Sequence, residues 1–131
     1  MRSVQTPLAP RPAGHYSQAI VHGDAVYVAG QLPIDPDNPK APPGDAAQQA
    51  RQALSNVARI LEAAGSGLDQ VLQMTIYVSD VSNWSAVNQV YAEIMGTHRP
   101  ARAVVPVGEL HYGYLVEIQA IAAVGGSQEV P

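Results

Sequence analysis

The chain has 131 residues, which is enough for one domain with a hydrophobic core and too few for two. Hydrophobic residues make up 47% of it and charged residues only 14%, so we expect part of the surface to be covered by another molecule. The net charge of −4, with Lys and Arg scattered along the chain, disfavours nucleic-acid binding. The absence of cysteine excludes disulfides, thiolate nucleophiles and cysteine metal sites.

The sequence shows no sign of membrane insertion or secretion. No segment approaches the roughly 18 apolar residues that a membrane span needs. The proline-rich N-terminus lacks the apolar core of a signal peptide. We therefore expect a cytoplasmic protein without membrane contact.

The N-terminal third predicts an arm, a hairpin and a loop. Residues 1–14 contain three prolines and predict an extended arm rather than a regular element. Two β-prone stretches, 17–22 and 25–31, flank Gly23-Asp24, a pair typical of a tight hairpin turn. The proline-rich residues 32–45 predict an irregular loop, and such loops often carry function.

Two amphipathic helices are predicted on either side of a strand. Asp45 suits an N-cap, and apolar residues at spacings of three and four continue to Gly65. Residues 71–79 alternate like a strand, with Leu72, Met74, Ile76 and Val78 expected on one face. A second helix is expected between Ser82 and Gly96, where the glycine ends it.

Two final strands, 101–110 and 114–124, are predicted to be joined at residues 111–113, followed by a frayed tail over 125–131. The order is then β-β-α-β-α-β-β in a single domain over 1–131. It indicates an α/β (α+β) two-layer sandwich with both helices on one face of a mixed sheet. The other face needs cover, which a homo-oligomer would supply.

General catalytic and nucleotide-binding motifs are missing from the sequence. The four histidines, His15, His22, His98 and His111, lack the spacing of a helical metal site, so no metal is expected.

Two charged residues near the C-terminus have two interpretations. Glu117 interrupts an apolar strand, on the face of Leu115, Gln119 and Ile121, and Arg102 opens the preceding strand. If the two strands pair as a hairpin, the two charges face a common cleft. One interpretation is a plain cross-strand salt bridge, which the pattern alone favours. In the other, the Arg102 guanidinium grips a substrate carboxylate, Glu117 orients a water, and Tyr16 adds a hydroxyl.

Several blocks in the right order resemble the Rid family of reactive-intermediate deaminases, the RidA-like or YjgF-type proteins. The blocks are GHYSQA (14–19), VAGQLPIDP (28–36), QARQALSNVARILEAAG (49–65), VNQVYAEIM (87–95), RPARAVVPVGEL (99–110) and VEIQAIAAV (116–124). The resemblance covers nearly the whole chain.

The resemblance implies a chorismate-mutase-like fold assembled as a homotrimer, with active sites between subunits. It implies that Arg102 binds the carboxylate of a 2-imino or enamine acid and that Glu117 positions the hydrolytic water. It also implies that Tyr16, Gly30 and Asn88 contribute to the site. Backbone groups around Gly30 and Val104 are expected to fix the plane of the imine.

Three departures from the family pattern stand out: Val104 replaces a frequent cysteine, His15 a proline, and Gln119 a second glutamate. Since water is the nucleophile in imine hydrolysis, the missing thiol need not abolish activity. The 110–114 loop also differs from the usual family sequence, which bears on substrate preference.

The expected function is hydrolysis of 2-imino or enamine acids to 2-keto acids and ammonia, as a 2-iminobutanoate/2-iminopropanoate-type deaminase without cofactor. The alternative is a non-catalytic homotrimer that binds small carboxylates or acts as a chaperone-like partner. A ribonuclease, a name attached to some relatives, is disfavoured by the acidic chain.

Overall fold

A computed structural model describes residues 1–125 of the chain. The strands are β1 (Arg2–Val4), β2 (Ala19–His22), β3 (Ala25–Gln31), β4 (Val71–Val78), β5 (Ala101–Pro106) and β6 (Val116–Ala123). The helices are α1 (Ala46–Ala63) and α2 (Trp84–Met95), with short 3-10 turns at Leu68–Gln70, Val81–Asn83 and His111–Gly113. The expected tail lies outside the described residues beyond Gly125.

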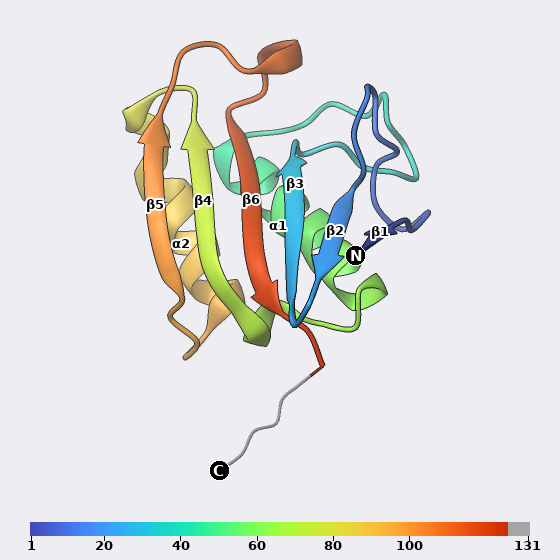
Figure 1. Ribbon diagram of the computed structural model, residues 1–131. Coiled ribbons are helices and arrows are strands. Elements are labelled where there is room, and N and C mark those ends of the chain that lie inside the picture. The colour runs from blue at the N-terminus through green and yellow to red at the C-terminus, as the bar shows by residue number, and fades with distance from the viewer. Residues whose placement is uncertain (126–131) are drawn as a thin grey trace.

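The strands form one six-stranded mixed sheet in the order β1-β2-β3-β6-β4-β5. β4 and β5 are parallel, and every other neighbouring pair is antiparallel. Both helices cover the same face of the sheet. Figure 1 views the molecule from the other side, where no helix covers the sheet. The predicted α+β sandwich is therefore confirmed.

The predicted pairing of the last two strands is wrong. β4 lies between β5 and β6 and bonds to both. The helix between β4 and β5 allows these two strands to run parallel, and β6 inserts at the centre of the sheet. Every second residue of β6 is buried, as the alternating sequence predicts. In contrast, β5 is a half-exposed edge strand that ends in Pro106.

Two further details differ from the sequence expectation. Arg2–Val4, expected within an extended arm, pairs with β2 as an edge strand, because backbone pairing needs no side-chain pattern. In β4 the register shifts between Val71 and Gln73, which buries Val71 and leaves Leu72 54% exposed. The bulge inverts the predicted alternation at Val71 and Leu72 only, and Met74, Ile76 and Val78 are buried as the sequence predicts.

The α1 helix forms where the sequence predicts it. The Asp45 carboxylate accepts a hydrogen bond from the Gln48 backbone N–H, and the Gln48 side chain accepts one from the Asp45 N–H, which makes a capping box. The helix packs its apolar stripe on β3 and β6 and lies beside α2. This stripe and the inner faces of the strands form the core.

Two buried amides on α1 hold the long loops in place. The Asn56 side chain, 1% exposed, donates to the carbonyls of Leu32 and Ile34, at 3.0 and 2.9 Å. The Gln49 side chain donates to the Gly44 carbonyl and accepts from the Leu115 N–H. The proline-rich loop and the start of β6 are thereby tied to the same helix.

No helix within residues 1–125 combines the length and the apolar character that a membrane crossing requires.

We predict that Asn56→Ala lowers the free energy of unfolding by about 2 kcal/mol, because it leaves two partly buried carbonyls without this donor. Urea denaturation followed by circular dichroism measures the loss. Gln52→Ala is the control, since Gln52 bonds only to the Asn56 oxygen. Equal stability of the two variants would show that the loop needs no such anchor.

Candidate functional site

Arg102 lies on the helix-covered face of the edge strand β5. Its register partner on β4 is Met74, a fully buried core residue, so both side chains point toward the helices. The Arg102 guanidinium donates to the Asn88 side-chain oxygen at 3.0 Å. Its central carbon lies 4.9 Å from the Trp84 ring centroid and 5.0 Å from that of Tyr91. The cation is therefore positioned by aromatic rings and an amide rather than by a carboxylate.

This arrangement leaves Arg102 able to bind an anion. A guanidinium has several N–H donors in one plane, and the Asn88 bond uses one of them. The described residues form two ion pairs, Arg51–Glu93 and Arg59–Glu62, and neither involves Arg102. The remaining donors fit the bidentate geometry of a carboxylate.

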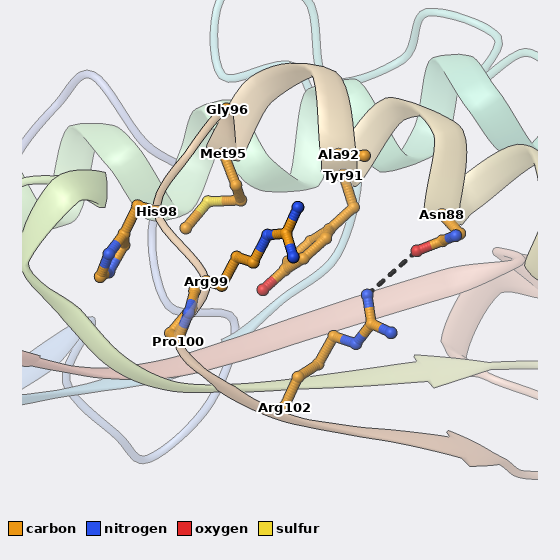
Figure 2. Close-up of a pocket in the computed structure, with 9 residues that line it drawn as sticks. All are labelled: Asn88, Tyr91, Ala92, Met95, Gly96, His98, Arg99, Pro100 and Arg102. Atoms are coloured by element: carbon orange, nitrogen blue, oxygen red, sulfur yellow. Dashed lines mark hydrogen bonds between the residues drawn. The ribbon is translucent and has the colours of Figure 1, made fainter.

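A pocket of about 420 Å³ opens beside Arg102, between the second half of α2 and the segment leading to β5. Figure 2 shows its wall. The lining residues are Asn88, Tyr91, Ala92, Met95, Gly96, His98, Arg99, Pro100 and Arg102.

Tyr91 forms the inner wall of this pocket and is 7% exposed. Burial raises the pKa of its hydroxyl, while the Arg102 guanidinium lowers it in part. The hydroxyl therefore stays protonated at neutral pH and is available as a hydrogen-bond donor.

Glu117 belongs to a second pocket, of about 460 Å³, on the other face of the sheet. Its register partner is Tyr77, which lies on the helix-free face. Gly30 lies directly against Glu117, and a Cβ atom there would overlap the carboxylate. Tyr16 also lines this pocket, and its hydroxyl accepts a hydrogen bond from the Ala13 N–H. A larger residue at position 30 would therefore displace the Glu117 carboxylate from its present position.

Arg102 and Glu117 do not meet within one chain. β4 separates their strands, and the two side chains point to opposite faces of the sheet. Both the predicted common cleft and the cross-strand salt bridge are therefore wrong for the single chain. The structure groups Asn88 with Arg102, and it groups Tyr16 and Gly30 with Glu117.

The positions that depart from the Rid pattern lie around these two groups. Val104 follows Arg102 on the helix-covered face and packs partly against the core. Gln119 accepts a hydrogen bond from the Tyr77 hydroxyl on the helix-free face. His15 is exposed beside Tyr16. The 110–114 loop places His111 and Tyr112 at the Glu117 pocket.

The described residues hold no cluster of His, Asp or Glu that suits a metal ion. His98 is fixed by a 2.7 Å hydrogen bond to the Val71 carbonyl. Because a carbonyl only accepts, the Nε2 atom of His98 must carry the proton.

The sequence reasoning missed two aromatic residues around Arg102. Trp84 lies four residues before Asn88 and Tyr91 three residues after it, so the three side chains share a face of α2. This spacing can be read from the sequence, but it is equally typical of residues that face a hydrophobic core, so it does not single out Trp84 or Tyr91.

Known proteins match this chain in sequence and in fold. The family model described as Endoribonuclease L-PSP matches residues 6–124. A RutC family protein from Pyrococcus horikoshii is 46% identical over 87% of this chain and 90% of its own. The 2-iminobutanoate/2-iminopropanoate deaminase of Capra hircus is 40% identical over 95% of this chain and 90% of its own.

Among solved structures, Escherichia coli TdcF with bound serine superposes with a TM-score of 0.90. It is 32% identical, and the match covers 95% of this chain and 100% of that one. Fold, sequence and family model agree over nearly the whole length, so the chain belongs to the Endoribonuclease L-PSP family, the YjgF/RidA family of proteins.

Proposed function

We propose that this protein hydrolyses 2-imino acids, and their enamine tautomers, to 2-keto acids and ammonia, with Arg102 holding the substrate carboxylate. One observation carries the proposal: the Arg102 guanidinium is fixed by Asn88, Trp84 and Tyr91, and no carboxylate of the described chain pairs with it. A preorganised cation with free donors binds an anion at little cost in side-chain entropy.

Relatives support both the reaction and the ligand. The mammalian relatives bear the name of an imine deaminase that acts on 2-iminobutanoate and 2-iminopropanoate. TdcF binds serine, a small molecule with the α-carboxylate that Arg102 is proposed to hold here.

Glu117 is proposed as the group that activates water. Its side chain makes no hydrogen bond or ion pair within residues 1–125, and it lines a pocket large enough for a small ligand. Its carboxylate accepts a proton from water as the water oxygen bonds to the imine carbon, and the imine nitrogen takes up a proton. The resulting carbinolamine collapses to the ketone and releases ammonia, so proton and bond changes balance without a cofactor.

Tyr16, Gly30 and Val104 complete the proposed site. The Tyr16 hydroxyl lies in the pocket of Glu117, and the backbone beside Gly30 and Val104 is proposed to hold the imine plane. Orientation of water and substrate then supplies much of the rate, because bound reactants lose little further entropy in the transition state.

A site that contains both Arg102 and Glu117 requires two chains. The two residues point to opposite faces of one sheet, and the helix-free face exposes apolar side chains such as Tyr27 and Leu72. We therefore propose a homotrimer in which Arg102 of one chain meets Glu117 of its neighbour.

We predict that Arg102→Ala lowers kcat/KM for 2-iminopropanoate about 100-fold, because the carboxylate loses a bidentate charged partner. The imine is generated in situ from alanine by an amino-acid oxidase, and pyruvate release is followed. Arg59→Ala, which removes an equal charge from the exposed face of α1, is the control. Unchanged rates would rule out the anchor, and carboxylate binding without acceleration by the wild type would favour a binding protein.

Glu117→Gln is expected to lower kcat about 100-fold while KM changes little, because the amide keeps the shape but accepts no proton. The same assay measures both constants, and Glu62→Gln is the matched control on α1. A similar kcat in Glu117→Gln and wild type would assign water activation to another group.

Mixing the two inactive variants tests the shared site. After joint refolding of Arg102→Ala with Glu117→Gln, about a quarter of wild-type activity should return, because random assembly pairs an intact Arg102 with an intact Glu117 at some interfaces. The variants refolded separately are the control. No recovery from verified mixed oligomers would place both residues of each site in one chain.

A further inference from the structure

A second cation, Arg99, lines the same pocket as Arg102. It lies on the segment between α2 and β5, and Figure 2 shows its side chain on the pocket wall with those of Tyr91 and Arg102. Within the described chain it has no hydrogen bond, and the two ion pairs present there involve other residues. The proposed function gives Arg99 no role.

The Tyr91 hydroxyl is the second observation that points to a ligand. It is the one buried side-chain polar atom in residues 1–125 that lacks a hydrogen-bond partner. Its ring lines the pocket and extends from α2 toward the segment that carries Arg99 and Arg102 (Figure 2). An unsatisfied buried hydroxyl costs free energy, and a ligand acceptor in the pocket would remove that cost.

The charge of the pocket favours an anion. Its lining includes two guanidinium groups and no Asp or Glu, although the whole chain carries a net charge of −4. A bound anion would interact favourably with both of these exposed cations at once. His98 contributes no donor from Nε2, because that atom is used by the Val71 carbonyl.

We propose that Arg99 and the Tyr91 hydroxyl bind the second carboxylate of dicarboxylic 2-imino acids, such as the imines of aspartate and glutamate. This substrate preference rests on the proposed function, since Arg102 holds the first carboxylate. Arg99 is then a specificity-determining residue rather than a catalytic one.

The dimensions favour two anionic groups over one. Extended chain advances about 3.3 Å per residue, so the Cα atoms of Arg99 and Arg102 lie on the order of 10 Å apart. A pocket of about 420 Å³ is also much larger than one carboxylate and falls in the range of small-ligand sites. A short dicarboxylate has the length to contact both guanidinium groups.

The test compares selectivity between two imines. Imines of alanine and glutamate are generated in situ by oxidases of matching specificity, and kcat/KM is measured for each. We expect the wild type to favour the dicarboxylic imine, and we expect Arg99→Gln to reduce the ratio of the two kcat/KM values at least tenfold. Tyr91→Phe, which removes only the hydroxyl, should reduce the ratio in the same direction. Arg59→Gln is the charge-matched control and should keep the wild-type ratio.

This assignment is wrong if Arg99→Gln leaves the ratio of the two kcat/KM values unchanged, or if the wild type prefers the alanine imine. Neither result would contradict the proposed deaminase activity. If the wild type accelerates neither imine, the deaminase proposal fails, and calorimetry with succinate and propionate decides the second subsite. Tighter binding of succinate that is lost in Arg99→Gln supports the subsite, and equal binding of the two acids overturns it.

Discussion

The insertion of β6 between β3 and β4 is the constraint on which the rest of the structure depends. Because β6 takes the central place, β5 becomes an edge strand and pairs only with β4. Arg102 then points under the helices, and Glu117 points to the helix-free face. The order of the strands in the sheet therefore keeps Arg102 and Glu117 of one chain apart. A proposed site that contains both side chains must include a second chain.

The α1 helix connects this sheet to the loops that border the Glu117 pocket. Its apolar stripe packs on β3 and β6, while its buried amides at Gln49 and Asn56 hold loop carbonyls and the N–H of Leu115. Buried polar groups stabilise a fold only when their hydrogen bonds are satisfied. Here those bonds also fix the loop geometry, so loop position follows from core packing.

Two groups among the charged residues of the chain differ in their surroundings. Arg51, Glu93, Arg59 and Glu62 pair with each other on exposed helix surfaces, where ion pairs contribute little. Arg102 is exposed on β5 beside the rings of Trp84 and Tyr91, and Glu117 is partly buried on β6. Neither has an opposite charge beside it in the described chain, so both are free to contact a ligand or another subunit.

The sequence by itself determined the local structure and the residues worth testing. The Asp45 cap, the Gly23-Asp24 turn and the alternation of β6 are encoded within a few residues, and an Arg or Glu in an apolar strand stands out without a structure. Strand pairing, the bulge that exposes Leu72, and the aromatic surroundings of Arg102 depend on contacts between distant segments. Local periodicity carries no information on which edges meet, so only the tertiary structure decided that Arg102 and Glu117 lie on opposite faces.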